Sequence, residues 1–285
     1  MTTYLITGAT GGYGSHAIKI LSHLVPKENI FALVRSEEKG AILEANGINI
    51  RVADYSDKAA LKKALAGIDK VLLVSSIPGN RQSEHQNVID AAKATDVKFI
   101  AYTSLAGADS TAANFSLGDD HRYTEKALGN SGIPFTSLRN NWYLENELPL
   151  ITAALQSGTF IFATDKDSQV GWVSRNDLAE AGVKVLVTES PSQIVELSGY
   201  NLTYTELVES LNQATGRNIT AKKGNIDDVI HSLVSSGFPA DAAPGFASLQ
   251  KAIAAGFLKS EKSDLEDILG RPATSISDSL KTLLS

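Results

Sequence analysis

The sequence predicts an α/β fold in which helices cover both faces of a doubly wound parallel sheet. Short runs rich in β-branched and aromatic residues alternate with helical patterns through the first half of the chain. These runs are almost uniformly apolar, as expected for strands buried on both faces. A glycine-rich segment, residues 8–14, follows the first run and opens the first helical pattern. Together these observations indicate parallel strands joined by right-handed crossovers.

The predicted elements alternate in order along residues 1–140. Strands are expected at residues 4–7, 30–34, 48–53, 70–75, 99–103 and 135–138. Helices are expected between them at residues 14–24, 37–46, 57–66, 82–95 and 119–130. Because each crossover returns the chain to the same end of the sheet, all strands would end at one edge. Ligands of doubly wound folds bind at that carboxyl edge.

The alternation ends after Leu138, and residues 139–168 are predicted to be loop-like with one helix near residues 148–156. We therefore divide the chain into a dinucleotide-binding region, residues 1–140, and a mostly helical region, residues 141–285. Segments of the second region are expected to return to the sheet. The rest of it is predicted to cover the carboxyl edge and to form the substrate side of a site.

Three capping patterns mark helix starts in the second region. Each places Ser or Thr three residues before an acidic residue, at 174–177, 203–206 and 263–266. Short strands are expected at residues 193–197 and 219–222. They would either return to the main sheet or form a small satellite sheet.

The composition is that of a mildly acidic globular protein. The chain has 285 residues, with 26 Lys and Arg against 32 Asp and Glu. This balance argues against nucleic acid as a partner, because nucleic-acid-binding surfaces are basic. Because it lacks cysteine, the chain has no disulfide, thiolate zinc site or cysteine nucleophile. No signal peptide or membrane-spanning run is recognisable, so a cytoplasmic protein without membrane contact is expected.

The glycine-rich segment reads Gly-Ala-Thr-Gly-Gly-Tyr-Gly. Gly8 would allow a sharp turn, and Gly14 would let the helix approach the strand closely. Gly11 and Gly12 would let a pyrophosphate approach bare backbone at the helix N-terminus, which attracts anions. The spacing predicts a Rossmann-type dinucleotide site; the alternative is a tight turn without a ligand. The predicted cofactor-binding residues are Gly8, Ala9, Thr10, Gly11, Gly12, Tyr13 and Gly14.

Arg35 ends the second strand, where an acidic residue would select NAD by binding the ribose 2′-OH. Its guanidinium can instead bind a 2′-phosphate and stack on adenine, which favours NADP(H). The alternative is a solvated arginine, and the nearby Glu37 and Glu38 would oppose a phosphate. Asp54, after the third strand, could accept from the adenine amino group or could be a simple turn residue.

Ser75, Ser76 and Ile77 follow the fourth strand, where the chain is expected to pass the cofactor's ribose and pyrophosphate. Small residues permit this approach, although a serine turn without a ligand is an equal alternative. His85 and His121 are assigned to helix surfaces. Neither has a partner at metal-ligand spacing, so no metal site is predicted.

Several segments together resemble the NmrA-like atypical short-chain dehydrogenases, and within them the bacterial NADPH:quinone oxidoreductases of type 2 and the triphenylmethane reductases. The resemblance rests on residues 8–14, Arg35, 53–55, 99–104, 138–146 and 268–272. It covers essentially the whole chain and is most specific at 138–146. In that family this loop lines NADP(H), which implies cofactor roles for Asn140, Asn141, Trp142, Tyr143 and Glu145. The alternative is that Trp142 and Tyr143 only anchor the core.

The usual acid–base pair of short-chain dehydrogenases is a Tyr followed four residues later by Lys on a helix. Here Tyr123 precedes Lys126 by three residues, which places the tyrosine about 60° around the helix from the lysine, on the other side from a residue at the usual spacing. The standard pair is therefore predicted to be missing. Lys126 is the catalytic candidate, acting on the cofactor ribose or the reduced oxygen; the alternative is a solvated helix lysine.

The resemblance implies an NADPH-dependent oxidoreductase that transfers hydride to a quinone or a similar flat electrophile. The acceptor is expected between the 140–145 loop, residues 102–106 and the C-terminal helices. Since the family also has non-catalytic members, the alternative is an NADP(H) sensor that binds a protein partner. Apolar stacking sites leave no spacing signature, so the sequence specifies neither the natural acceptor nor the oligomeric state.

Overall fold

The computed structural model describes residues 1–110, 116–189 and 191–285. Its main feature is a seven-stranded sheet with the strand order β3-β2-β1-β4-β5-β6-β9. Every neighbouring pair in this sheet is parallel. The strands are β1 Tyr4–Ile6, β2 Ile30–Val34, β3 Asn49–Val52, β4 Lys70–Leu73, β5 Phe99–Leu105, β6 Phe135–Asn140 and β9 Ile194–Leu197. The predicted doubly wound sheet is confirmed, and the run at residues 193–197 returns to it as the seventh strand.

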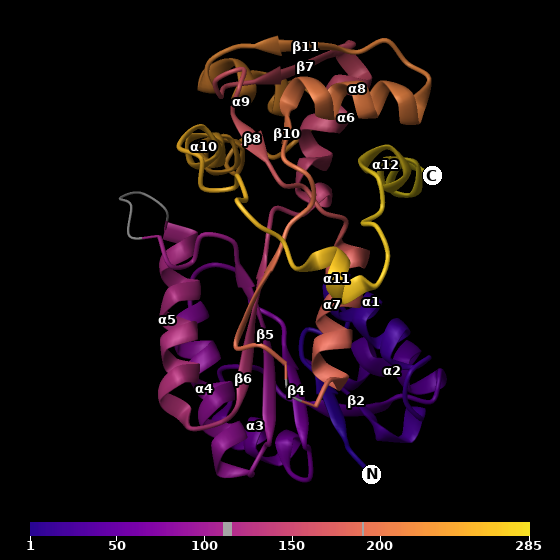
Figure 1. Cartoon of the computed structure of the whole chain (residues 1–285), viewed down its shortest axis with the longest axis vertical. Helices are drawn as coiled ribbons and strands as arrows, with labels where there is room; N and C mark the ends of the chain where they lie inside the picture. Colours follow the sequence, from indigo (N-terminus) through magenta and orange to yellow (C-terminus); the bar gives the residue numbers. More distant parts are fainter. Residues whose placement is uncertain (111–115, 190) are drawn as a thin grey trace.

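Helices cover both faces of the sheet, as Figure 1 shows. One face carries α1 Gly12–Leu21, α2 Glu37–Ala45 and α7 Arg175–Val187; the other carries α3 Lys58–Leu65, α4 Arg81–Ala94 and α5 Ser116–Ser131. A short 3-10 helix, η1 Lys27–Asn29, precedes β2. Because side chains alternate along a strand, Tyr4 and Ile6 join one apolar core and Leu5 the other. This alternation explains the uniformly apolar runs.

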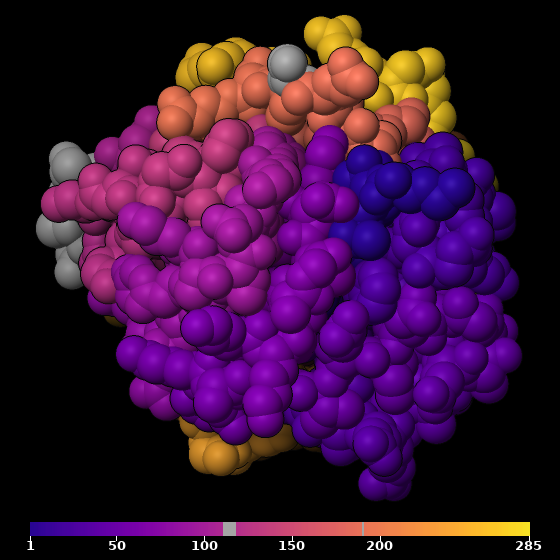
Figure 2. Space-filling model, turned by 90° about the horizontal axis from the view of Figure 1, so that it is seen from below, coloured from indigo at the N-terminus to yellow at the C-terminus, as the bar shows by residue number. Residues whose placement is uncertain are grey.

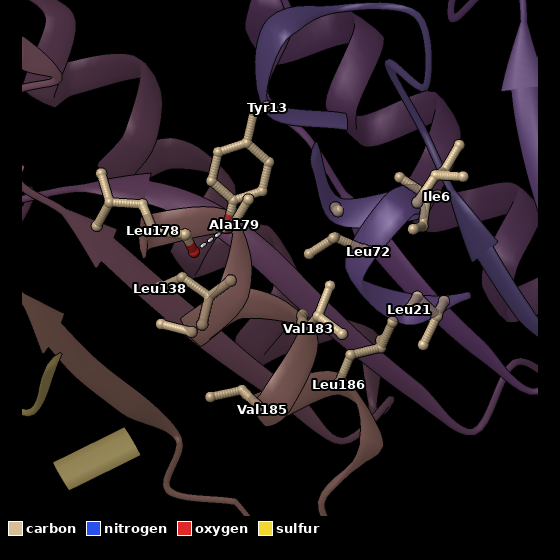
Figure 3. Close-up of a cluster of buried hydrophobic side chains, with 14 of the residues drawn as sticks. Ile6, Tyr13, Leu21, Leu72, Leu138, Leu178, Ala179, Val183, Val185 and Leu186 are labelled. Atoms are coloured by element: carbon tan, nitrogen blue, oxygen red, sulfur yellow. Dashed lines mark hydrogen bonds between the residues drawn. The ribbon is translucent and has the colours of Figure 1, made fainter. Parts of the chain in front are cut away.

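The core between α1, α7 and the sheet fixes the helix that follows the glycine-rich turn. Tyr13 lies between the two helices and donates a hydrogen bond to the Leu178 carbonyl at 2.8 Å (Figure 3). Gly182 leaves room for this ring, because a Cβ there would lie 2.2 Å from the Tyr13 hydroxyl. The second half of the chain thus helps to position the N-terminal turn.

The remaining elements form a C-terminal lobe above the carboxyl edge of the sheet (Figure 1). They are η2 Leu144–Glu147, α6 Leu148–Ser157, β7 Thr159–Phe162, β8 Gln169–Val170, β10 Leu202–Thr203, α8 Tyr204–Thr215, β11 Thr220–Lys223, α9 Ile226–Ser235, α10 Ala243–Ala254 and α12 Ile276–Leu284. Helix α11, Leu265–Leu269, instead packs against α7. From below, the first half of the chain forms most of the visible face, and parts of the second half appear at its margins (Figure 2).

The lobe corrects two expectations. Residues 139–168 are less loop-like than predicted, because β6 extends to Asn140 and β7 pairs with β11 in a satellite sheet. The capping patterns at 174–177 and 203–206 are confirmed. The pattern at 263–266 is not, because α11 begins only after Asp264 and the Ser263 hydroxyl instead bonds the Ser198 carbonyl. Within the described residues, no helix is long and apolar enough to cross a membrane.

Candidate active site

The glycine-rich turn at the end of β1 has the geometry of an anion site. Gly8 adopts a positive φ of 57°, and the Gly11 amide donates to its carbonyl at 2.9 Å. A Cβ on Gly14 would lie 2.3 Å from the Gly8 carbonyl oxygen, so only glycine permits this contact between helix and turn. The first amides of α1 have no partner within the helix, and Gly11 and Gly12 put no side chain of their own over them, which favours a phosphate there.

A cavity of about 630 Å³ opens above this turn and runs along the carboxyl edge of the sheet. It is lined by the backbone turn, by the ends of β2, β3 and β4, and by two residues of the second half of the chain. The lining residues are Gly8, Thr10 to Gly14, Leu33 to Arg35, Lys39, Ala53 to Tyr55, Val74 to Ile77, Glu84, Tyr143 and Arg175. Of the residues predicted for the turn, Ala9 alone is missing from this lining, and its side chain is fully buried.

Two exposed cations, Arg35 and Lys39, stand at the β2 end of this cavity. Lys39 belongs to the first turn of α2, whose N-cap is Ser36, so the helix N-terminus adds a favourable potential for an anion. Asp54 also lines the cavity, and its carboxylate accepts from the amide and the hydroxyl of Ser56. These hydrogen bonds lower the pKa of Asp54 and keep it ionised.

Backbone contacts hold Ser75 and Ser76 beside the cavity. The Ser75 amide donates to the Thr103 hydroxyl, and the Ser76 amide donates to Nε2 of His85 at 3.0 Å. The Ser76 carbonyl accepts from Nε of Arg81 at 2.8 Å. The Ser76 hydroxyl itself is buried and has no hydrogen-bond partner among the described residues. A buried hydroxyl without a partner suits a polar ligand group.

The expectation that His85 and His121 lie on the surface is wrong. Their exposed fractions are 0% and 6%, because α4 and α5 turn both rings toward β5. His85 Nε2 accepts from a backbone amide, so its Nδ1 donates to the Thr124 hydroxyl. Arg81 Nη1 lies 3.2 Å from Nε2 of His121, which must accept, so Nδ1 of His121 donates to the Tyr102 hydroxyl.

Both histidines are therefore neutral. Burial and the nearby Arg81 charge lower the pKa of His85 to about 3 and that of His121 well below its usual value. The positive charge of this cluster resides on Arg81, which is 6% exposed and whose nearest carboxylate, Asp120, lies 3.9 Å away. None of the described residues accepts a hydrogen bond from Nη2 of Arg81. A buried guanidinium with free donors can stabilise an anionic ligand.

The loop after β6 is ordered by its own polar side chains. Asn140 donates to the Tyr143 hydroxyl at 3.0 Å, and Asn141 donates to the Ser198 hydroxyl and the Leu258 carbonyl. Trp142 donates from its indole to the Glu147 carboxylate. Burial raises the pKa of the Tyr143 phenol to about 12, so it stays protonated. The Asn140 amide oxygen is buried and unpartnered among the described residues, as the Ser76 hydroxyl is.

Arg175 is a site residue that the sequence did not reveal. Its amide donates to the Glu145 carboxylate at 2.9 Å, and its guanidinium lies 5.4 Å from the Tyr143 ring centre. A Cβ on Gly12 would lie 2.4 Å from its Nη1, so the guanidinium covers the glycine-rich turn. It is well placed to neutralise a pyrophosphate. In the sequence, Arg175 is marked only by the predicted helix cap at Ser174. Its contact with the glycine-rich turn depends on the packing of α7 against α1, which the sequence does not show.

A second cavity, of about 580 Å³, adjoins the first. The two share Ser75, Ser76, Ile77, Tyr143 and Arg175 in their linings. The second cavity extends toward α10, with Trp142, Phe238, Phe246 and Leu249 as apolar lining and Arg81, Ser104, His121 and Asn140 as polar lining. A largely apolar cavity with a few polar groups suits a flat organic ligand. The two cavities form one site with a dinucleotide-sized arm and an aromatic arm.

The structure does not bring Lys126 to this site. It is exposed on α5 and lines neither cavity, and Tyr123 is 40% exposed. Helix α5 instead turns His121 and Glu125, four residues apart, toward the sheet. The Glu125 carboxylate accepts from the Ser104 hydroxyl at 2.6 Å and from Arg139. Lys126 directly follows Glu125, so it points about 100° around the helix from this inward face. Its predicted catalytic role therefore has no geometric support.

Comparison with known proteins gives a consistent result. Residues 8–189 match a family of NAD(P)H-binding proteins. The chain is 40% identical to quinone oxidoreductase 2 of Escherichia coli over 98% of both chains. The structure of that NADPH-dependent quinone oxidoreductase in complex with NADPH matches with a TM-score of 0.91, over 99% of this chain and 100% of the other.

Two further relatives extend this comparison. An NmrA-like family domain-containing oxidoreductase of Aspergillus flavus is 29% identical over 99% of this chain and 94% of its own. The triphenylmethane reductase of Citrobacter, in complex with NADP(H), is 30% identical and matches with a TM-score of 0.89 over 98% and 99% of the two chains. The resemblance drawn from the sequence motifs is confirmed.

Proposed function

Because the chain belongs to the family of NAD(P)H-binding proteins and matches a quinone oxidoreductase over its whole length, we propose that it is an NADPH-dependent reductase of quinones or similar flat electrophiles. The observation that carries the proposal is the pair of adjoining cavities, one over the glycine-rich turn and one lined by aromatic side chains and Arg81. A hydride donor in the first cavity and an acceptor in the second would meet beside Ser76 and Tyr143.

The residues present fit NADP(H). The α1 N-terminus and Arg175 would hold the pyrophosphate, and Arg35 with Lys39 would hold the 2′-phosphate. Asp54 would accept from the adenine amino group. The unpartnered Ser76 hydroxyl and Asn140 amide oxygen would bind the nicotinamide end. When bound, NADPH supplies the hydride.

The acceptor arm then has to stabilise negative charge. Addition of hydride to a quinone leaves a hydroquinone monoanion, and one proton from water completes the hydroquinone. Arg81 is the buried cation that faces this charge, and its contacts with His121 and the Ser76 carbonyl hold its guanidinium in place. Preorganised donors of this kind lower the barrier because they need no reorientation during the reaction. Neutral His121 acts by positioning Arg81, since its lowered pKa leaves the protonated imidazolium, the form that would donate a proton, unpopulated.

The two regions of the chain divide this work in the proposal. Residues 1–140 supply most of the dinucleotide arm. Residues 141–285 supply Arg175 and the α10 side of the acceptor arm. We also propose a cytoplasmic location.

The rival function is an NADP(H) sensor that binds the dinucleotide without turnover. A panel of benzoquinones, naphthoquinones and triarylmethane dyes, followed by NADPH absorbance, separates the two functions. We expect NADPH oxidation with at least one quinone. Tight NADPH binding without oxidation by any acceptor would favour the sensor.

Cofactor choice gives a prediction about Arg35. Arg35→Ala should weaken NADPH binding about 10- to 100-fold, because one charge-assisted phosphate contact is lost, and should leave NADH binding within about twofold. The measurement is a fluorescence titration of both reduced cofactors. Glu38→Gln, on the neighbouring first turn of α2, is a matched surface control that should not weaken NADPH binding. An unchanged NADPH preference in Arg35→Ala would contradict the assignment.

A further inference from the structure

A carboxylate in the C-terminal lobe binds both tryptophans of the chain. Glu147 ends η2, and its exposed fraction is 2%. Its Oε1 accepts from the indole of Trp142 at 3.1 Å and from the indole of Trp172 at 3.2 Å. The Tyr204 hydroxyl lies 3.4 Å from both carboxylate oxygens. No positive side chain pairs with Glu147 among the described residues.

This carboxylate joins the acceptor cavity to the core of the lobe. Trp142 lines the cavity, whereas Trp172 and Tyr204 are buried among Phe160 and Phe162. The indole of Trp142 is therefore anchored at its N–H by a group that the core holds rigidly. A change in the strength of that anchor would change the shape of the aromatic wall.

We propose that Glu147 is a positioning residue whose carboxylate sets Trp142 in the wall of the acceptor cavity, so that ionisation of Glu147 tunes the binding of a flat aromatic acceptor. This inference rests on the proposed function in one respect, that the second cavity is the acceptor site. It goes beyond that function because it assigns a pH-dependent acceptor affinity to a residue outside both cavity linings.

The chemistry of the four groups supports this role. An indole N–H can only donate, so both tryptophans require an acceptor from Glu147. A carboxylate accepts such bonds about twice as strongly as a neutral carboxylic acid does. When Glu147 is protonated, its own O–H can donate to the Tyr204 hydroxyl, and the two indole bonds weaken together. Trp142, which is the less buried of the two tryptophans, then gains freedom.

Glu147 is expected to ionise in a pH range in which the protein can be studied. Burial raises the pKa of Glu147 to about 7, and the three donors only partly oppose this rise. Tyr204 on α8 is the other titratable group at the carboxylate, and burial keeps its pKa far above 10. Helix α6 has no titratable side chain, and on α12 the exposed Asp278 and Lys281 pair with each other. On η2 itself, Glu145 binds the Arg175 amide.

The first test needs no acceptor. Tryptophan emission of the full-length protein, measured from pH 5.5 to 8.5, should change with a midpoint near pH 7. Trp172→Phe leaves Trp142 as the single reporter, and the change should persist in it. Glu147→Gln keeps an acceptor oxygen for the indoles and should show a flat profile. Tyr204→Phe should move the midpoint upward, because the carboxylate loses a donor.

The second test measures acceptor binding directly. The dissociation constant of menadione for the NADP⁺-bound protein, measured by quenching of tryptophan emission, should rise about 3- to 10-fold from pH 8 to pH 6. In Glu147→Gln it should vary less than twofold, and NADP⁺ affinity should not change between the two proteins. This expected change corresponds to losing part of one charge-assisted hydrogen bond.

The outcomes separate this inference from the proposed function. Menadione binding with the predicted pH dependence but without NADPH oxidation would support the inference and refute the reductase. NADPH oxidation together with an unchanged pH dependence of binding in Glu147→Gln would refute the inference and leave the reductase standing. An emission titration that survives in Glu147→Gln would also refute it, as would a wild-type profile without a transition.

A stability measurement provides an independent check on the ionisation. The pKa of Glu147 is higher in the folded chain than in the unfolded chain, so the folded state binds the proton more tightly. The free energy of unfolding should therefore fall as the pH rises from about 4.5 to about 7 and then level off. Glu147→Gln should lack this part of the fall. An equal fall in both proteins would show that Glu147 does not titrate in this window.

Discussion

Replacing Arg81 with methionine is expected to lower kcat for quinone reduction about 100- to 1000-fold, the usual loss when one preorganised donor to a developing oxyanion is removed. Methionine is apolar and long enough to fill the space, so the loss should come from the charge and not from a cavity. Arg81→Lys retains a charge and should lose less, although it cannot reproduce the contacts with both Ser76 and His121.

The control variant is Lys126→Met, which removes an exposed cation from the neighbouring helix α5. Its kcat and KM should stay within about twofold of the wild type. Guanidinium ion added to an Arg81→Ala protein should restore part of the activity, whereas ammonium ion at the same ionic strength should restore less. Loss of NADPH binding in Arg81→Met in proportion to the loss of kcat would instead show that Arg81 acts by holding the Ser76 segment.

Substituting Gly14 with alanine is expected to cost about 3 kcal/mol or more of the free energy of unfolding and to abolish NADPH binding. The new Cβ would lie 2.3 Å from the Gly8 carbonyl oxygen and 2.9 Å from the Ala9 Cα. These are backbone atoms, so the turn or α1 must move to admit the methyl group. The midpoint of thermal unfolding should fall by roughly 6–12 °C, and the displaced turn could no longer accept a pyrophosphate.

Gly12→Ala is the matched control for this prediction. Its Cβ would also meet an atom at 2.4 Å, but that atom is Nη1 of Arg175, the end of a flexible side chain. The free energy of unfolding should therefore change by less than about 1 kcal/mol, while NADPH binding should weaken because Arg175 is displaced from the turn. Equal destabilisation by the two substitutions would contradict the assigned close approach at Gly14.

Most of the sheet could be predicted from local sequence, for a physical reason. Strands buried on both faces have uniformly apolar side chains, so Leu5 and its neighbours on either core are recognisable without knowledge of their partners. The glycine-rich turn was also recognisable from local sequence. Gly14 has to be glycine because of the Gly8 carbonyl, which is only six residues earlier in the chain. Arg35 was found because it directly follows the second strand, a position that can be identified from the order of the predicted elements.

The second cavity lies where the sequence led us to expect an acceptor, between the 140–145 loop, residues 102–106 and the C-terminal helices. Its charged lining could not be predicted in this way. Arg81, His121 and Arg175 come together only when α4, α5 and α7 take their places on the two faces of the sheet. His85 and His121 were assigned to helix surfaces because their spacing indicated no metal site. Their burial follows from the packing of α4 and α5, which the sequence alone does not show. Lys126 was proposed because it follows Tyr123 on the same helix, although by three residues instead of the usual four. On α5 it lies one residue after the inward-facing Glu125 and is exposed.

Of the strands in the small sheets of the lobe, β11 was predicted at residues 219–222, whereas β7, β8 and β10, which are two to four residues long, were not. Such runs contain too few alternations for a period-two signal. Glu147 was likewise not singled out, since a glutamate in a polar loop carries no sign that two indoles will surround it. Only the folded lobe makes it a buried acceptor.

Single-turnover hydride transfer tests the central claim most directly. The protein with one equivalent of NADPH, mixed anaerobically with excess 1,4-benzoquinone in a stopped-flow instrument, should lose the NADPH absorbance and form one hydroquinone per NADPH. NADPH with deuterium in the transferred position should slow this phase. The absence of cysteine removes thiol addition to the quinone as a competing reaction. NADPH that stays bound and unoxidised would contradict the account and identify the protein as a binder of the dinucleotide.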